Sequence, residues 1–324
     1  MSNMFKIYRY TDSDRNLWDN FVPVGNNGTL FHLRSFLNYH PPERFLDHSL
    51  LVEKKGKLFS VFPAAEKKIG NHNCLVSHPG SSVGSFIVPD NLSIADSFDL
   101  VKTLISYTRK TKLSRIRITL PPNIYQKRLS NYMDFSFFKN NFYYVNRDIT
   151  SILFLEKTIN DTVKKFRSSH QRSIRKAKES GVVVKQSKDF NSFYKILSKN
   201  LKIRHNVNPT HSLEELIKIH TLFPTRCNLF AAFLNEKMIA GVVNFIINDQ
   251  TVLAFYISHD EDYGDYRAVN LLFYTIFEWA IESNYKIYDF GTFTVNEEPN
   301  MGLGRFKENF GASGIFRDTI EYSL

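Results

Sequence analysis

The residue types best suited to chemistry gather near the end of the chain, in Tyr288-Asp-Phe-Gly291 and in Gly302-Leu-Gly-Arg-Phe-Lys-Glu-Asn-Phe-Gly311. The first segment predicts a buried strand that ends at its glycine, and the second predicts a short helix that carries Arg305 and Lys307. Two phenylalanines four residues apart anchor one face of this helix, so we expect both basic side chains to point off that face. A glycine-rich helix N-terminus beside two cations suits an anionic ligand.

A second concentration of positive charge lies upstream. Between Lys157 and Lys188, ten lysines and arginines stand against two acids, which is a net +8 of the +10 carried by the whole chain. Apolar residues at steps of three and four predict a helix over 163–180 with Gly181 as its C-cap and His170 in the core. The opposite face is either solvated or binds the phosphates of RNA, a nucleotide sugar or a coenzyme. Its basic residues include Arg172, Arg175 and Lys176.

Several chemistries have no support in the sequence. There is no G-x-G-x-x-G after a strand, no phosphate-binding Gly-Lys-Ser/Thr, no G-x-S-x-G elbow and no zinc-ligand spacing, so we expect no metal. Cys74 and Cys227 are isolated in apolar runs, which predicts buried free thiols and a reducing compartment. The N-terminus has no signal-peptide core and no stretch is long enough to span a membrane, so we expect a cytoplasmic protein.

The elements that must position these residues form a weak internal repeat. Three strands, a loop with a glycine, an amphipathic helix and a short strand occur once in each half of the chain, and His78 and His259 close the equivalent third strands. The repeat predicts an α+β protein of two similar domains, 1–145 and 146–324, with mostly antiparallel mixed sheets flanked by helices. The repeated helices are expected at about 94–109 and 267–282, each followed by a strand, at 115–119 and 286–290.

Length and composition agree with two compact domains. The chain has 324 residues, of which 43% are hydrophobic and 23% charged. A basic chain with 29 Phe, 16 Tyr and 2 Trp first suggests a nucleic-acid binder. Most aromatics fall on apolar faces of expected strands and helices, however, and therefore belong to cores.

Three segments resemble the FemAB/FemX-type transferases and the related FemAB-like acetyltransferases of the GNAT (GCN5-related N-acetyltransferase) superfamily, which have two GNAT-like domains. The first is Asp289-Phe-Gly291 with Arg305-Phe-Lys-Glu-Asn-Phe-Gly311. The second is Ser169-His-Gln-Arg-Ser-Ile-Arg-Lys-Ala177, and the third pairs Phe31-His-Leu-Arg-Ser-Phe36 with Ser77-His-Pro-Gly-Ser81. The sequence departs from ordinary GNATs where they carry Q/R-x-x-G-x-G/A, since it reads Tyr263-Gly-Asp-Tyr-Arg-Ala268.

The resemblance implies an N-acyltransferase that moves an acyl group, expected to be acetyl from acyl-CoA, to an amine of a cell-envelope or polysaccharide precursor such as an amino sugar. The acceptor would be a small molecule or a nucleotide- or lipid-linked amino sugar. FemX-type members instead take an aminoacyl group from tRNA, which is the alternative donor. The FemX lysine expected soon after Phe36 is absent, and the nearby residues are Asn38, Tyr39 and His40.

The resemblance also supplies expected site residues. Lys307 matches the family lysine near the acceptor, and we expect it to bring positive charge to the acyl or phosphate oxygen, with Asp289 as the second catalytic residue. Arg305, Arg172, Arg175, Lys176, His78, Ser81 and His259 are the expected substrate- or phosphate-binding residues. A non-catalytic protein that binds RNA or polyphosphate through the basic helix remains a second alternative.

Overall fold

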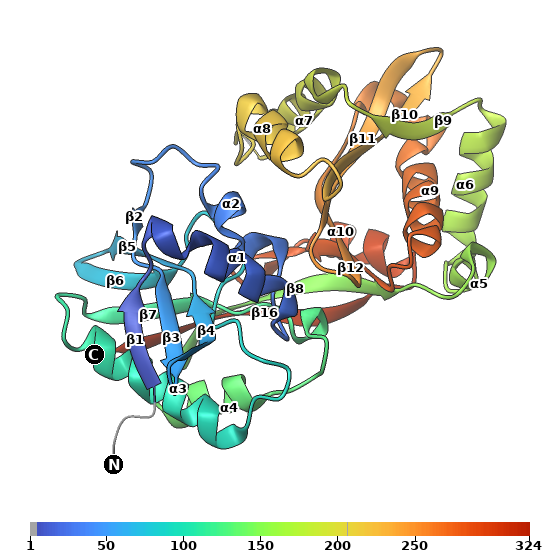
Figure 1. The fold of residues 1–324 in the computed structure, drawn as a ribbon. Coiled ribbons are helices and arrows are strands. Elements are labelled where there is room, and N and C mark those ends of the chain that lie inside the picture. Colours follow the sequence, from blue (N-terminus) through green and yellow to red (C-terminus); the bar gives the residue numbers. More distant parts are fainter. Residues whose placement is uncertain (1–4, 206) are drawn as a thin grey trace. The chain divides into compact units, whose positions relative to one another are not determined.

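The computed structural model describes residues 5–205 and 207–324, and its contacts divide the chain into two units (Figure 1). The first unit runs to Asp148 and adds Phe316–Leu324; the second is Ile149–Ile315. The sequence places the C-terminal strand with the second domain, whereas this strand groups with the first unit because Thr319–Ser323 pair with Arg115–Thr119. Each unit combines parallel and antiparallel strand pairs with helices, as the α+β prediction requires.

Two sheets form the first unit. A small antiparallel sheet has the order β1-β3-β4, and the strands of the second follow the order β2-β5-β6-β7-β16. Their bounds are β1 Phe5–Arg9, β2 Leu46–Asp47, β3 Leu50–Lys54, β4 Lys57–Phe62, β5 Ala64–Ile69, β6 His72–Ser77, β7 Arg115–Thr119 and β16 Ser313–Ser323. The helices are α1 Arg15–Val24, α2 Arg34–Leu37, α3 Ile94–Thr108 and α4 Tyr132–Lys139. Leu100, Leu104 and their neighbours on α3 pack with Leu75 and Ile116 into one core.

The strands of the second unit's sheet region follow the order β8-β13-β12-β11-β10-β9. The strands are β8 Tyr143–Phe154, β9 Val183–Ser187, β10 Cys227–Leu234, β11 Lys237–Ile246, β12 Thr251–His259 and β13 Ile287–Thr292, and a separate hairpin joins β14 Thr294–Val295 to β15 Glu298–Pro299. The helices are α5 Ile159–Val163, α6 Ser168–Glu179, α7 Phe190–His205, α8 Leu213–Leu222, α9 Ala268–Glu282 and α10 Met301–Glu308. The inner face of α9 forms most of the aromatic core with Phe290 and Phe310.

The internal repeat is present in the backbone of both units. In the first, β6 leads through α3 into the parallel strand β7, with Leu75 opposite Ile116. In the second, β12 leads through α9 into the parallel strand β13, with Val252 opposite Tyr288. A strand, a crossover helix and a parallel strand therefore follow antiparallel strands twice.

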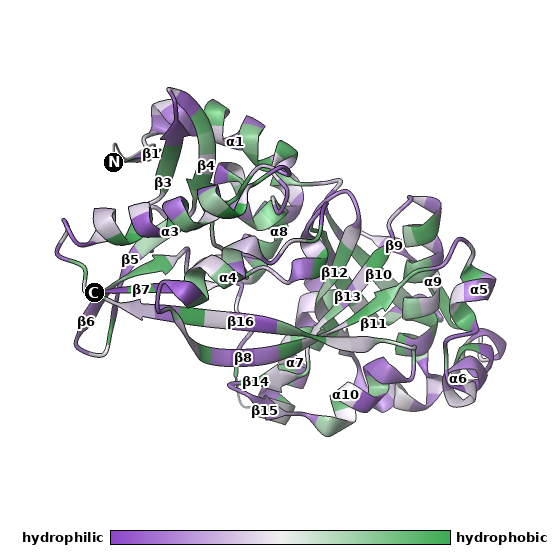
Figure 2. Ribbon diagram, turned by 90° about the horizontal axis from the view of Figure 1, so that it is seen from below, coloured by the Kyte–Doolittle hydropathy of each residue, from purple (hydrophilic) through white to green (hydrophobic). Residues whose placement is uncertain are grey.

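Several boundaries differ from the sequence expectation. The expected strand 58–65 is split at Pro63 into β4 and β5, because proline cannot donate to the ladder. The helix expected over 163–180 begins only at Ser168, with Arg167 as its N-cap. Its end agrees, since Gly181 has a φ of 78° and the next amide donates to the Ala177 carbonyl. In Figure 2, α6 is mainly hydrophilic while the strands of this unit's sheet are largely hydrophobic.

Candidate active site

In the second unit, the parallel strands β12 and β13 pair over only three residues. Their register ends at Leu253 opposite Asp289, although β12 continues to His259. β13 turns at Gly291, whose φ of 75° is a left-handed conformation that glycine adopts without strain. Beyond Leu253, the edge of β12 that faces β13 is no longer paired with it. The backbone N–H and C=O groups on this edge can therefore bind a ligand.

The turn at Gly291 is held from both sides by buried charged residues. The carboxylate of Asp289 accepts hydrogen bonds from the Gly291 amide (2.7 Å) and from the Thr150 hydroxyl. The Lys307 Nζ donates to the carbonyls of Gly291 (2.7 Å) and Thr292 (2.9 Å). Both side chains are buried, so the expectation that Lys307 lies on an outer helix face is wrong. The helix α10 turns it toward the end of β13 instead.

A cavity of about 530 Å³ lies in the second unit beside the end of β12. Its walls come from α7, the end of β12, the start of α9 and the start of α10. His259 lines it, and the backbone carbonyl of this histidine accepts a hydrogen bond of 2.6 Å from the Asn200 amide. Leu197, Ile257 and Phe306 add apolar surface. Its size suits a ligand of drug or coenzyme-fragment dimensions.

Two helix N-termini open on this cavity. α9 begins at Ala268 without a side-chain cap, and α10 begins at Met301 under the Asn300 side chain, which accepts from the Leu303 amide. Asn270, in the first turn of α9, is 6% exposed, and its amide nitrogen has no hydrogen-bond partner within the described chain. Helix N-termini and an unpaired amide donor together favour an anionic or carbonyl oxygen.

Charged groups of both signs surround the approach to α9. Asp260 pairs with Lys199 at 3.3 Å and with Lys237 at 3.5 Å. Three further acids, Glu261, Asp262 and Asp265, are exposed in the turn before the helix. The turn in which ordinary GNATs carry glycines is thus an acidic surface segment here.

Of the expected substrate- or phosphate-binding residues of the second unit, the four basic ones are exposed, whereas His259 is half-buried. Arg305 lies on the surface of α10. Arg172, Arg175 and Lys176 form the outer face of α6, whereas His170 on the inner face is buried and packs against Phe310. The prediction of a core histidine is therefore confirmed, and burial lowers the pKa of His170.

His78 and Ser81 belong to the first unit. Burial, more than the neighbouring charges, lowers the pKa of His78 to about 4, and its ring contacts Phe45. It lines a cavity of about 500 Å³ with His40 and residues of α2. Ser81 lies outside this lining, and its hydroxyl is 2.7 Å from the Val83 carbonyl, so this side chain holds the loop.

Sequence reasoning missed the buried charge of this cavity. Arg34 is 3% exposed and forms an ion pair with Asp47, and its Nε has no partner within the described residues. The ring of Tyr10 lies 3.9 Å from the guanidinium of Arg34, and burial raises the pKa of its hydroxyl. Arg34 stands inside the Phe31–Phe36 segment, and Asn270 interrupts an apolar helix start, so both carried a visible signal.

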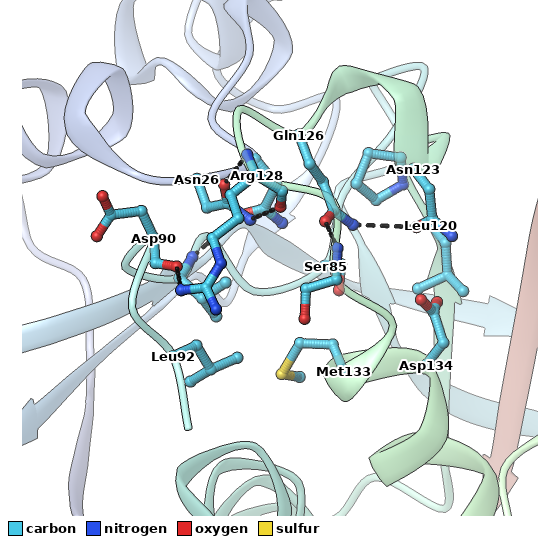
Figure 3. Close-up of a pocket in the computed structure, with 14 residues that line it drawn as sticks. Asn26, Ser85, Asp90, Leu92, Leu120, Asn123, Gln126, Arg128, Met133 and Asp134 are labelled. Carbon is cyan, nitrogen blue, oxygen red and sulfur yellow. Dashed lines mark hydrogen bonds between the residues drawn. The ribbon is translucent and has the colours of Figure 1, made fainter. Parts of the chain in front are cut away.

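A third pocket, also in the first unit, is narrow and polar. It has room for about 30 Å³, which is enough for roughly two water-sized groups. In Figure 3, Arg128 and Asp134 lie on opposite sides of it, with Ser85 and Met133 between them. Burial and then the charge of Asp318 raise the pKa of Asp134 to about 6.

Residues 164–308, which include most of the second unit and its whole cavity, match the family described as Acetyltransferase (GNAT) domain. This segment has the GNAT fold. The chain is accordingly a transferase of the acyltransferase type, as the sequence suggested. No curated protein gives a significant sequence match.

Solved structures share the fold along nearly the whole chain. FemX superposes with a TM-score of 0.75 at 15% identity, covering 98% of this chain and 97% of FemX. The C-terminal domain of a putative lysylphosphatidylglycerol synthetase from Agrobacterium fabrum gives 0.61 at 10% identity, covering 95% and 91%. A tandem GNAT protein from the clavulanic acid biosynthesis pathway gives 0.55 at 10% identity, covering 98% of each chain. The tandem GNAT architecture is confirmed.

The described residues also bear on metal binding and on membrane insertion. No group of three His, Cys, Asp or Glu side chains there is placed to hold a metal ion. Within the same residues, no helix has the length and apolarity needed to cross a bilayer.

Proposed function

We propose that the second unit transfers an acyl group from acyl-CoA to the amino group of a cell-envelope or polysaccharide precursor, such as an amino sugar. One observation carries this proposal: two helix N-termini and the unpaired Asn270 amide open on the cavity beside the shortened β12–β13 pairing. Such donors favour the phosphate and carbonyl oxygens of an acyl thioester.

The reaction needs a positioned acyl group and a neutral amine. The amine nitrogen attacks the thioester carbon, an N–C bond forms, and the carbonyl oxygen takes negative charge. The C–S bond then breaks, the coenzyme leaves as a thiol or thiolate, and the proton lost by the amine passes to a base. His259, half-buried at the cavity wall, is our candidate for that base.

Asp289 and Lys307 have a positioning part in this proposal. The Asp289 carboxylate is occupied by the Gly291 amide and the Thr150 hydroxyl. Lys307 fixes two carbonyls at the end of β13 and places a positive charge there. They keep β13 apart from β12, and the lysine charge favours oxyanion formation nearby.

We propose separately that the first-unit cavity around Arg34 and His78 binds a sugar ring. Buried Arg34, the neutral histidine and the aromatic rings of Tyr10 and Phe45 offer donors and flat apolar surfaces. This combination suits the hydroxyls and ring faces of a sugar. A cytoplasmic location for the reaction remains a prediction from the sequence.

An aminoacyl-tRNA donor is the second candidate. It is favoured by the exposed basic face of α6, with Arg172, Arg175 and Lys176, and by the exposed acids in the turn before α9, which do not suit the coenzyme pyrophosphate. Basic side chains on α6 can bind successive phosphates of an RNA backbone. A donor that places no pyrophosphate at α9 is not repelled by the acidic side chains in the turn before that helix.

The test incubates the purified full chain with acetyl-CoA, longer acyl-CoAs or charged tRNA, and with glucosamine or a nucleotide-linked amino sugar. Mass spectrometry of the acceptor and release of free thiol report transfer. Acylated amino sugar with a stoichiometric thiol supports the proposal, and transfer that nuclease abolishes supports the tRNA donor. An unmodified acceptor with every donor, from protein that melts cooperatively, contradicts both.

A further inference from the structure

The helix α4 of the first unit is apolar on both its inner and its outer side. Ser136 and Phe137 face the core and are buried. Tyr132, Phe135 and Phe138 are 42%, 50% and 64% exposed, and Leu129, just before the helix, is 69% exposed. A surface helix normally has polar residues opposite its buried stripe, so this outer face requires a partner or an apolar medium.

The outer face continues onto α3. The ring of Phe98 lies 5.9 Å from that of Phe135, and Ile94, one turn before Phe98, is 39% exposed. Figure 1 also draws α3 and α4 side by side. With Leu129 left aside, we call these five residues the α3–α4 apolar face: Ile94, Phe98, Tyr132, Phe135 and Phe138.

Two lysines border this face. Lys139 follows Phe135 by four residues, and Lys102 follows Phe98 by four, so each lies one helical turn from an aromatic ring. Both are exposed, and neither forms an ion pair among the described residues. The acids nearby point elsewhere or lie to the side: Asp134 lines the pocket of Figure 3, and Asp99 is about 100° around α3 from Phe98.

We propose that the α3–α4 apolar face docks on the surface of an anionic lipid bilayer. Aromatic rings enter the headgroup boundary, and Lys102 and Lys139 meet the negative surface. This placement lies on a membrane and needs no spanning helix. It is independent of the acyl-transfer proposal, because no residue of the face lines the cavity beside β12 or the cavity around Arg34.

The charges argue against the other occupants. A second copy of the chain would set each lysine pair against its equivalent, and like charges at an apolar contact are costly. Single-stranded RNA needs a track of cations along its backbone, whereas this face has more aromatic rings than lysines.

Sedimentation of the full chain with vesicles tests the proposal. Vesicles of phosphatidylcholine alone are compared with vesicles of equal parts phosphatidylcholine and phosphatidylglycerol. We expect binding to the second kind only, weakening with salt. The double variant Tyr132→Ser/Phe138→Ser should bind about tenfold more weakly or worse. Lys102→Gln/Lys139→Gln should lose roughly 30-fold, since each cation near the surface contributes about fivefold.

The matched control is Phe154→Ser, which removes a 49% exposed phenylalanine of the second unit. Thermal melting verifies that each variant is folded, and light scattering with and without RNA reports other partners. Vesicle binding that is equal in the control and in Tyr132→Ser/Phe138→Ser overturns the proposal. So does the absence of binding by the unaltered chain, or a dimer or RNA complex that these two substitutions dissolve.

Discussion

Asp289 and Lys307 bind the two backbone groups of the same residue, Gly291. The Gly291 amide donates to the Asp289 carboxylate, and the Gly291 carbonyl accepts from Lys307, each over 2.7 Å. An acidic and a basic residue eighteen positions apart in the sequence thus fix a single glycine in a left-handed conformation. Because β13 leaves β12 at this glycine, the clamp sets where the strands part.

Replacing Lys307 with methionine should damage both folding and turnover. Two partly buried carbonyls lose their donor, so the free energy of unfolding should fall by about 1–3 kcal/mol. Turnover should fall at least 100-fold, since charge near a forming oxyanion is typically worth that much. Denaturant unfolding and steady-state rates measure the two effects. Near-normal turnover in a folded variant would remove Lys307 from the mechanism.

The variant Asp289→Asn distinguishes two roles of this carboxylate, which are holding the turn at Gly291 and accepting a proton from the amine. An asparagine oxygen still accepts from the Gly291 amide, so turnover should stay within about tenfold of the unaltered rate. Stability should drop by about 1 kcal/mol through loss of a charge-assisted bond. A fall of a thousandfold with an intact melting curve would instead make this carboxylate the general base.

Asn270→Leu should weaken donor binding without harming the fold. Leucine is close in volume and removes a buried amide nitrogen that has no partner, so stability should be unchanged or slightly higher. The KM for the acyl donor should rise about tenfold, as one hydrogen bond to a charged oxygen is lost. The control is Asn191→Leu at an exposed position of α7. Equal KM values in the two variants would contradict a donor site at α9.

Stability of the first unit should fall as the pH drops from about 6.5 to 4. Burial lowers the pKa of both His32 and His78 to about 4, so in this range the unfolded chain binds protons that the folded chain excludes. Each histidine costs up to about 3 kcal/mol at the acid end. Asp134 works in the opposite sense, because its raised pKa of about 6 makes the folded chain bind a proton first.

The measurement for this dependence is urea unfolding at several pH values, followed by a probe in the first unit. His78→Gln should flatten the slope between pH 4 and 6.5, and Asp134→Asn should steepen it. A slope that neither substitution alters would show that other groups govern the acid response.

The triple variant Arg172→Gln/Arg175→Gln/Lys176→Gln tests the basic face of α6. These side chains are exposed, so melting should shift little. If the donor is a tRNA, the dependence of transfer on salt should weaken markedly because three phosphate contacts are lost. The control neutralises Lys57, Lys67 and Lys68, exposed lysines of the first unit. An effect of equal size in the control would mean that only net charge matters.

The repeat was readable from the sequence because strand–helix–strand order depends on local periodicity, as at β12, α9 and β13. Gly181, which ends α6, was readable for the same reason, since caps are local. The burial of Lys307 was not, because its partners are carbonyls fifteen and sixteen residues away, and spacing alone does not reveal them. Pairs such as Arg34 with Asp47 likewise depend on tertiary contacts.

Strand β16 has a consequence for the order of synthesis. Residues 316–324 complete the first unit, where the buried Glu321 receives Arg115 and Arg117 at 2.8 and 2.9 Å. The ribosome makes these residues only after all of 149–315. The second unit can therefore fold while the chain is still growing, whereas the first waits with an open edge at β7 until the last strand emerges.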